Sequence, residues 1–235
     1  MDSALIDAVR AGDRRALSRA ITKVEQDGTS TGLGVAHGVV GITGPPGAGK
    51  STLISALIDV IRERGESVGV LAIDPSSPIT GGAILGDRIR MQSHVDDENV
   101  YVRSMATRGH LGGLADATGE AVRLLGAAGF DRLIVETVGV GQSEVEIMGL
   151  ADVVVLVVGP SWGDQVQADK AGILEIAHIF VVNKADRPGV EEVRRALRET
   201  ADAGDVKILL TSATTGEGVA DVLDEIDRLV GLNGA

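Results

Sequence analysis

Short aliphatic runs alternate with amphipathic helical patterns along most of the chain. Several runs, such as DVVVLVVG and HIFVVNK, are nearly continuous apolar stretches. Strands of this kind are typical of a parallel sheet that is covered on both faces, and alternation with helices indicates crossover connections. The pattern predicts strands at residues 38–43, 67–73, 100–105, 132–136, 152–158, 178–183 and 207–212.

Helical periodicity fills the intervals between these strands and predicts helices near residues 50–64, 113–128, 165–176, 189–202 and 218–230. Before the first strand, residues 2–27 carry apolar positions at helical spacing and predict one or two helices, with Asp13 capping the second. Residues 28–37 are predicted to form a flexible connector. We therefore expect an α/β fold with a mostly parallel central sheet flanked by helices. A short N-terminal helical extension over 1–35 would precede the main domain over 36–231.

The composition indicates an aliphatic core and a reducing compartment. Hydrophobic residues make up 44% of the 235 positions, but aromatic residues make up only 2%. The absence of Cys excludes disulfides and thiolate metal sites. The N-terminus carries acidic residues where a signal peptide would be basic, and the longest apolar stretch, 153–158, is too short to cross a bilayer. We expect a cytoplasmic protein.

The net charge of −12 at pH 7 limits the kinds of partner. Binding to DNA, RNA or an anionic membrane needs clustered Lys and Arg, which displace counterions from the phosphates. The acidic balance therefore argues against nucleic-acid and membrane partners, and it otherwise favours solubility.

The clearest motif lies between the first predicted strand and the helix that follows it. The segment GPPGAGKS, residues 44–51, fits G-x-x-x-x-G-K-[ST] in full and indicates a P-loop NTPase fold. Its glycines let backbone N–H groups face phosphate oxygens, and the helix N-terminus adds its positive end. Lys50 would reach the β- and γ-phosphates, and Ser51 would offer its hydroxyl to Mg²⁺. The alternative is a Gly-rich turn with an incidental Lys, and the predicted strand before the motif and helix after it argue against that alternative. The expected phosphate-binding residues are Gly44, Pro46, Gly47, Ala48, Gly49, Lys50, Ser51 and Thr52.

The sixth predicted strand ends in FVVNKAD, which places Asn183, Lys184 and Asp186 in an N-K-x-D pattern. A carboxylate at the last position can accept hydrogen bonds from the ring N–H and the 2-amino group of guanine, whereas adenine has no such pair of donors. A site that leaves a polar group unpaired with the wrong ligand can reject that ligand by roughly 10⁴-fold or more. The pattern therefore predicts guanine specificity, with the stem of Lys184 along the base plane. Backbone N–H groups beyond the seventh strand are expected to bind the guanine carbonyl, from Ser212, Ala213 and Thr214.

Acidic residues stand at two strand ends on the same expected edge of the sheet. Glu136 begins the segment ETVG, in which the N–H of Gly139 can sense a γ-phosphate. Asp74 ends the second strand, and Asp87 follows in a loop of Pro and Gly that can close over nucleotide and reopen after hydrolysis. Mg²⁺ prefers oxygen ligands. The expected metal ligands are Ser51, Asp74, Asp87 and Glu136, and the expected catalytic residues are Lys50, Asp74 and Glu136.

Other roles remain open for several polar residues. Glu136 could instead cap a strand-to-loop junction, and Asp87 could cap a helix over RIRMQSHV. Gln142 lies three residues beyond Gly139, not directly after it as the water-positioning Gln of small GTPases does, so the residue that positions the attacking water is left open. Arg108 and Lys170 could neutralise transition-state charge or could be ordinary surface or hinge cations. The histidines lack metal-ligand spacing and are predicted not to be ligands; they are His37, His94, His110 and His178.

The loops together are more specific than any single motif. The segments GPPGAGKSTL, AIDPSSPITGGAILGDRIRM, RGHLGGLA, ETVGVGQSEVEI and GDQVQADKAGILEIAHIFVVNKAD, with AGDRRALSRAITKVE near the N-terminus, resemble the MeaB/ArgK/MMAA family of SIMIBI-class P-loop GTPases. The resemblance extends from about residue 4 to residue 230. It implies a GTPase chaperone that gates adenosylcobalamin loading and protects or reactivates a cobalamin-dependent acyl-CoA mutase, such as methylmalonyl-CoA mutase.

The resemblance also implies ligands, partners and switch residues. The ligands would be Mg²⁺ and GTP or GDP, with no tightly bound cobalamin on this chain, and hydrolysis would be slow until a partner stimulates it. The mutase is the expected partner, and its adenosyltransferase is a second candidate. The loop from Asp74 to Arg90 matches a switch that responds to nucleotide. A further switch, which responds to the mutase, is matched by Asp164, Gln167 and Lys170.

Two departures from the family pattern bear on the partner. Gln165 stands where the family usually has an acid, and Asp169 stands where it usually has an apolar residue. Family members also continue into a helical C-terminal arm used for dimerisation, whereas this sequence stops soon after its last predicted helix. We therefore expect weak or no self-association and an assembly that depends on the mutase.

Three other functions fit parts of the pattern. A metallochaperone GTPase that delivers nickel is the leading alternative, but it would need soft or imidazole ligands, and the chain has no Cys and no His cluster. A P-loop small-molecule kinase is disfavoured by the N-K-x-D pattern and by the lack of an acceptor-binding lid. A scaffold that does not hydrolyse nucleotide is disfavoured by Lys50, Ser51 and Glu136.

Overall fold

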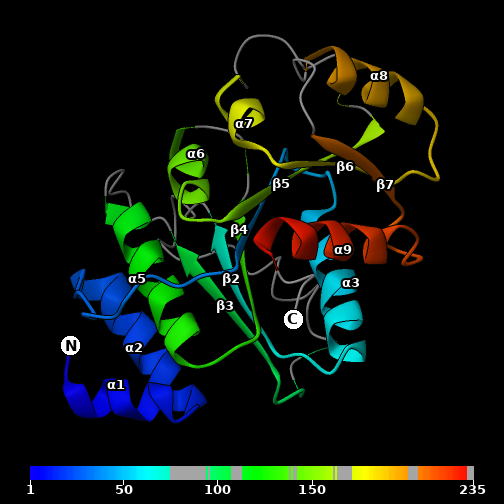
Figure 1. Cartoon of the computed structure of the whole chain (residues 1–235). Helices are drawn as coiled ribbons and strands as arrows, with labels where there is room; N and C mark the ends of the chain where they lie inside the picture. Colours follow the sequence, from blue (N-terminus) through cyan, green and yellow to red (C-terminus); the bar gives the residue numbers. More distant parts are fainter. Residues whose placement is uncertain are drawn as a thin grey trace.

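Seven strands form one sheet at the centre of the molecule (Figure 1). The computed structural model describes residues 1–74, 94, 96–106, 113–137, 139, 142–160, 162, 171–200 and 206–231. The strands are β1 (Val39–Thr43), β2 (Val68–Asp74), β3 (Val100–Ala106), β4 (Arg132–Thr137), β5 (Val153–Val158), β6 (Ile179–Asn183) and β7 (Lys207–Thr211). Every pairing between them is parallel, so the sheet is fully parallel where a mostly parallel one was expected. Each predicted strand boundary lies within one residue of the observed one.

The helices are α1 (Ser3–Arg10), α2 (Arg14–Asp27), α3 (Lys50–Glu63), α5 (Gly113–Ala127), α6 (Gln142–Met148), α7 (Ala171–Ile176), α8 (Val190–Thr200) and α9 (Val219–Val230). The prediction missed α6, which has only seven residues and is too short for a helical period to stand out. The helix predicted over 165–176 is described only from Ala171 onward, because residues 163–170 lie outside the described ranges. In the described part of the chain, no helix is long and apolar enough to span a membrane.

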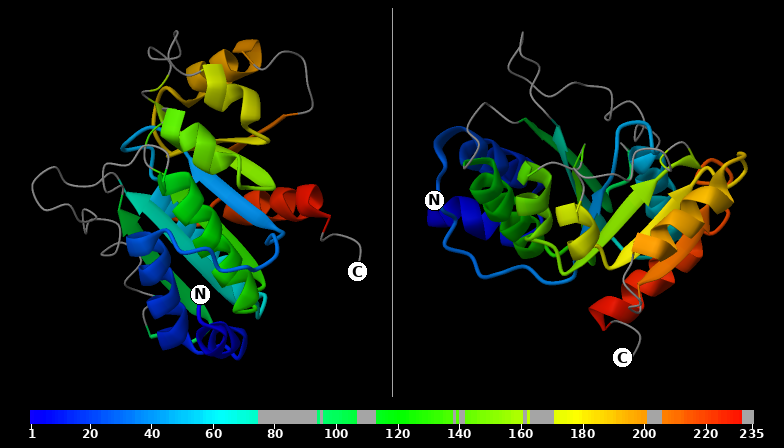
Figure 2. Two further views of the ribbon diagram at one scale, coloured as in Figure 1. Left: turned by 90° about the vertical axis from the view of Figure 1, so that its left-hand side faces the viewer. Right: turned by 90° about the horizontal axis from the view of Figure 1, so that it is seen from above.

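Side-chain alternation along the strands separates two hydrophobic cores, one on each face of the sheet. In β5, Val153, Val155 and Val157 belong to the core that contains the apolar residues of α3 and α9. Val154, Leu156 and Val158, their neighbours in sequence, belong to the core formed with α5, α6, α7 and α8. Helices therefore cover both faces, as the continuous apolar strands predict, and Figure 2 shows the sheet between the two groups of helices.

The strand order brings distant parts of the chain to one edge of the sheet. The order is β3-β2-β4-β1-β5-β6-β7, with β1 at the centre between β4 and β5. Because all strands are parallel, their carboxyl ends meet at the same edge, where ligands bind in open α/β sheets. This edge carries the residues that follow β1, β4, β6 and β7, which hold most of the predicted nucleotide site.

The two N-terminal helices pack on α5, and α2 also packs on the edge strand β3 (Figure 1). The carboxylate of Asp13 accepts hydrogen bonds from the backbone N–H groups of Arg15 (2.8 Å) and Ala16 (3.0 Å), which confirms the predicted cap of α2. Ile21 and Val24 are fully buried and join the same core as α5. The extension thus shares its core with the sheet, and a domain boundary after residue 35 stays a prediction.

Candidate nucleotide-binding site

Residues 44–49 connect β1 to α3. The N-cap of the helix is Gly49, which has no side chain that could cap the first N–H groups. The first N–H groups of a helix have no intrahelical partner, and the helix dipole is positive there, so such an end binds anions. A Cβ at Gly44 would lie 2.0 Å from the carbonyl oxygen of Val157, and one at Gly49 would lie 2.4 Å from Nδ2 of Asn183. Both residues also have positive φ, 144° and 93°, so this path of the loop requires glycine at each position.

Lys50 is the first residue of α3, and its side chain folds back over the loop. Its Nζ donates to the carbonyl oxygens of Gly44 (2.9 Å) and Pro45 (3.1 Å), and the residue is only 5% exposed. The ammonium group is therefore directed into the loop by main-chain oxygens. A phosphate bound at the open end of α3 would lie within reach of the same charge.

Ser51 and Glu136 meet at the junction of β1 and β4. The hydroxyl of Ser51 donates to Oε1 of Glu136 at 2.9 Å, and the two residues are 5% and 1% exposed. The pairing of Ile42 with Glu136 across the two strands places the acid beside the start of the loop. A buried carboxylate next to a hydroxyl is the hard-oxygen chemistry that Mg²⁺ prefers, so these residues fit that ion. Asp87 and the side chain of Asp74 lie outside the described residues, although β2 ends at Asp74 as predicted.

A small hydroxyl network joins the ends of β1 and β4. Thr137 donates its hydroxyl to the hydroxyl of Thr43 at 3.0 Å, and Thr43 donates to the carbonyl oxygen of Gly139 at 2.9 Å. The N–H of Gly139 donates to the carbonyl oxygen of Gly44 at 3.2 Å. The sequence analysis did not single out either threonine. The sequence carries one signal for them, because each is a polar residue at the last position of a buried strand.

Asn183 connects the phosphate loop to the segment after β7. Its Nδ2 donates to the carbonyl oxygen of Ala48 at 3.0 Å, and its Oδ1 accepts from the hydroxyl of Thr211 and the N–H of Ala213, both at 3.1 Å. Asn183 is only 2% exposed. The structure thus brings together three segments that the sequence placed in one site.

The two other residues of the N-K-x-D pattern lie beside this connection. Lys184 has a φ of 62°, and its Nζ donates to the carbonyl oxygen of Gly47 at 2.7 Å, so its stem spans the space between the two segments. Asp186 is exposed, and its Oδ1 accepts a hydrogen bond from the hydroxyl of Ser212 at 3.1 Å. Ser212 therefore orients the carboxylate that was predicted to bind guanine. Thr214 is exposed on the same segment.

A cavity of about 500 Å³ lies next to the loop. Its walls come from Pro45 and Pro46 of the loop, from Pro160 and Trp162 after β5, and from Lys184 after β6. Trp162, the single Trp of the chain, is 3% exposed and was not singled out from the sequence. The side chain of Lys184 therefore lines this cavity and also lies beside the segment that was predicted to bind the base.

Several predicted residues cannot be placed in the site. Outside the described residues lie Arg108, His110, Asp164, Gln167 and Lys170, and the side chain of Gln142, the first residue of α6, is also undescribed. Two histidines have structural partners: His94 Nε2 lies 3.4 Å from the hydroxyl of Ser55, and His178 Nδ1 accepts from the N–H of Val154 at 3.0 Å. Within the described ranges, no group of three or more His, Cys, Asp or Glu residues could hold a metal ion.

Known proteins are similar in sequence to most of this chain. The family described as methylmalonyl Co-A mutase-associated GTPase MeaB matches residues 10–233. A relative from Pyrococcus horikoshii, which carries a provisional GTPase name, is 51% identical over 240 residues that cover 94% of this chain and 75% of the relative. The mouse protein named methylmalonic aciduria type A homolog, mitochondrial, is 40% identical over 195 residues, which cover 79% of this chain and 47% of that protein.

Two solved structures have a similar fold. The crystal structure of the LAO/AO transport system kinase superposes with a TM-score of 0.72 at 28% identity and covers 99% of this chain and 76% of its own. The hydrogenase maturation factor HypB from Archaeoglobus fulgidus has a TM-score of 0.59 at 18% identity, covering 94% and 99%, which is a likeness of fold alone. With a family match over residues 10–233 and a relative at 51% identity, the chain belongs to the MeaB family of P-loop GTPases.

Proposed function

We propose that this GTPase gates the loading of adenosylcobalamin onto a cobalamin-dependent acyl-CoA mutase, such as methylmalonyl-CoA mutase, and protects or reactivates that enzyme. The name of its family, which refers to association with methylmalonyl Co-A mutase, supports the choice of partner, as does the name of the mouse relative. In this proposal the cobalamin stays with the mutase, and the chain contributes nucleotide-dependent control. The adenosyltransferase that supplies the cofactor is a second proposed partner.

The observation that carries the nucleotide-dependent part is the position of Asn183. Its buried side chain joins the phosphate loop at Ala48 to the base-recognition segment at Ala213. Because the two segments share one side chain, a guanine nucleotide that binds both stabilises them together. Release of the nucleotide would loosen both. A chaperone that acts in steps needs a coupling of this kind between its ligand and its loops.

We infer the following roles for the described residues. The N–H groups at the start of α3 and the ammonium of Lys50 bind the phosphates, because they form the open positive end of the loop. Ser51 and Glu136 hold Mg²⁺, with Asp74 and Asp87 as further proposed ligands. When bound, the ion neutralises charge on the phosphates. Asp186, oriented by Ser212, accepts the hydrogen bonds of guanine.

The proposed response to the mutase involves Asp164, Gln167 and Lys170, which follow the end of β5. Trp162 and Pro160 connect β5 to this segment and line the cavity beside the phosphate loop. A conformational change in the phosphate loop would therefore be transmitted through Pro160 and Trp162 to the segment that contains Asp164, Gln167 and Lys170. The likeness to HypB concerns the fold alone, so it adds no site for the metallochaperone alternative.

The test combines base selectivity with stimulation by the partner. GDP is expected to bind at least 100-fold more tightly than ADP by calorimetry, and GTP hydrolysis is expected to rise severalfold when a cobalamin-dependent mutase is added. Lys50→Ala should abolish turnover, whereas Lys23→Ala, on the exposed face of α2, should leave it unchanged. Equal affinity for GDP and ADP would contradict the nucleotide assignment. Selective GTP binding without any response to the mutase would contradict the partner alone.

A further inference from the structure

Gly139 is held on the end of β1 by two hydrogen bonds of its own backbone. Its N–H donates to the carbonyl oxygen of Gly44 at 3.2 Å, and its carbonyl oxygen accepts from the hydroxyl of Thr43 at 2.9 Å. Thr137 completes the arrangement by donating to the Thr43 hydroxyl at 3.0 Å. Thr43 is fully buried and Thr137 is 1% exposed, so neither hydroxyl exchanges this partner for bulk water.

The carbonyl oxygen of Gly44 accepts a second hydrogen bond, from Nζ of Lys50 at 2.9 Å. The N–H of Gly139, by the expectation from the sequence, and the ammonium of Lys50, by the proposed function, would both turn to the terminal phosphate. In this structure both point at one main-chain oxygen at the start of the phosphate loop. A terminal phosphate would compete with that oxygen for both donors.

We propose that Thr43 and Thr137 are positioning residues that fix the resting place of Gly139 against Gly44 and thereby set how strongly the site prefers a nucleoside triphosphate over a diphosphate. The hydrogen bond from Thr43 to Gly139 stabilises the resting arrangement and is unaffected by a diphosphate. A triphosphate must draw the N–H of Gly139 away from Gly44, and the Thr43 contact adds to the cost of that movement. The inference rests on the proposed function, because it uses the phosphate-binding role assigned there to Lys50, together with the γ-phosphate contact expected of Gly139 from the sequence.

Thr43 contacts Gly139 directly, whereas Thr137 contacts it only through Thr43, so variants of the two residues can serve as controls for each other. Thr43→Val removes the donor to Gly139 and should lower the cost of moving it, whereas Thr43→Ser keeps the hydroxyl. Thr137→Val removes only the donor behind Thr43, so its effect should be smaller. Thr43→Val leaves the Thr137 hydroxyl without its acceptor, and the double variant Thr43→Val/Thr137→Val removes that hydroxyl as well. Replacing both partners of a buried hydrogen bond by apolar groups is often nearly neutral. The double variant therefore isolates the loss of the Thr43 donor to the carbonyl oxygen of Gly139.

The experiment measures two quantities on the full chain. Calorimetry gives the affinities for GDP and for a non-hydrolysable GTP analogue in the presence of Mg²⁺. NMR gives the exchange rate of the Gly139 amide in the protein without nucleotide. For Thr43→Val we expect the affinity for the GTP analogue to rise about 2- to 10-fold relative to GDP, which corresponds to the net contribution of one hydrogen bond. Amide exchange at Gly139 should accelerate by a similar factor, and Thr43→Ser should stay within about twofold of the wild type in both measurements.

An unchanged ratio of the two affinities in Thr43→Val and in the double variant would overturn the inference. This holds whether both affinities stay at their wild-type values or change by the same factor, and an equal change indicates only a structural role. These outcomes differ from failure of the proposed function, in which the wild-type chain would bind ADP as well as GDP. In that case the amide exchange rate of Gly139 still tests whether Thr43 holds Gly139 in place. An unchanged rate in Thr43→Val would show that it does not.

Discussion

The side-chain amide of Asn183 donates to the carbonyl oxygen of Ala48 at 3.0 Å, across 135 residues of sequence. The same side chain accepts hydrogen bonds from Thr211 and Ala213 through its oxygen. One buried residue thus fixes the distance between the loop before α3 and the segment after β7, which is proposed to bind the base. The phosphates and the base of a nucleotide must fit their segments at the same time. A change in this distance is therefore expected to lower nucleotide affinity more than a change within either segment alone.

Replacing Asn183 by Asp tests this coupling. Asn183→Asp keeps an acceptor for Ala213 but loses the donor to Ala48, and it places a carboxylate next to a carbonyl oxygen in a buried site. We expect the affinity for GDP to fall by about 10-fold or more, because an unsatisfied buried group costs about 1–3 kcal/mol. Isothermal titration calorimetry measures the change. Thr211→Val, which removes only one of the donors to Asn183, serves as the control and should cost less than about threefold.

An Asn183→Asp variant with wild-type affinity would show that the two segments keep their spacing without this side chain. The base preference should also be measured. In the proposed function the ratio of GDP to ADP affinity depends on Asp186, so this ratio should change little. A loss of selectivity with unchanged GDP affinity would therefore contradict the role given to Asn183.

Sequence reasoning succeeded where the determinant is local. The strands could be located because β5 and β6 are short continuous apolar runs, and the loop at Gly44 and the N-K-x-D pattern at Asn183 each lie in one stretch of chain. The cap of α2 by Asp13 was also readable, because the capping residue and its partners are three residues apart or less.

Features that depend on strand order could not be predicted. The contact of Thr43 with Thr137 exists because β4 lies beside β1, and nothing in the apolar runs of the two strands specifies that neighbour. Trp162 was missed for a related reason, since its closeness to Pro46 follows from the position of β5 next to β1. Register and order are set by the packing of helices over the sheet, which a single sequence reveals only in outline.

Glycine at position 49 is expected to be required for the loop to coexist with Asn183. A Cβ there would lie 2.4 Å from Nδ2 of Asn183, a side chain that is itself fixed by its partners. At Gly47, where φ is also positive at 77°, a Cβ meets no atom within 4 Å. Both substitutions to Ala carry the backbone cost of a left-handed residue, about 1–2 kcal/mol, but only Gly49→Ala adds a collision.

Gly49→Ala should therefore lower stability by at least about 1 kcal/mol more than Gly47→Ala does, and it should reduce GDP affinity by about 10-fold or more. Chemical denaturation and calorimetry on the two variants give both values. Similar losses of stability in the two variants would mean that Asn183 moves aside, and would contradict the tight packing described above.

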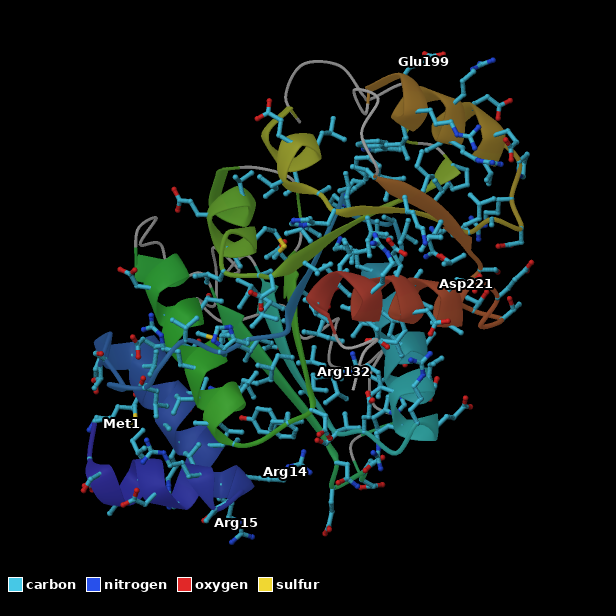
Figure 3. All side chains as sticks on the ribbon, viewed as in Figure 1. Met1, Arg14, Arg15, Arg132, Glu199 and Asp221 are labelled. Carbon is cyan, nitrogen blue, oxygen red and sulfur yellow. The ribbon has the colours of Figure 1, made fainter. Side chains whose placement is uncertain are left out.

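Arg14 connects the N-terminal helices to the sheet and has a matched neighbour in Arg15 (both labelled in Figure 3). Its guanidinium donates to the carbonyl oxygens of Asp97 and Val100, and it lies 5.6 Å from the centroid of the Tyr101 ring. Arg14→Ala removes hydrogen bonds and a cation–π contact, so it should lower the free energy of unfolding by about 1–2 kcal/mol. Arg15→Ala, at an exposed position of the same helix, should change it by less than about 0.5 kcal/mol. Urea denaturation measures the free energy of unfolding of both variants. Equal changes would show that the contacts of Arg14 add no stability beyond that of an exposed side chain.

Glu225 gives the fold a measurable dependence on acid pH. Its carboxylate is 4% exposed and accepts hydrogen bonds from the guanidinium of Arg228, at 2.6 Å for the shortest, and from the ammonium of Lys207. These two cations hold the pKa of the Glu225 carboxyl below its ordinary value of 4.5, and burial opposes them without cancelling the effect. A carboxyl whose pKa is lower in the folded state stabilises the fold above its unfolded pKa. That stability is lost as the pH falls through the folded pKa.

Glu225→Gln removes the charge and keeps the shape of the side chain. At pH 7 the variant should be less stable than the wild type by on the order of 1 kcal/mol, because both cations are more than half exposed and solvent weakens the pairs. The difference should be constant down to about pH 5 and should shrink below 4.5, as the wild-type carboxyl takes up its proton. Denaturant titrations of both proteins between pH 7 and about pH 3.5 measure it, with Glu217→Gln as an exposed control whose difference from the wild type should stay near zero. A Glu225→Gln difference that grew toward acid pH would mean that burial, rather than Arg228 and Lys207, dominates the pKa of this carboxyl.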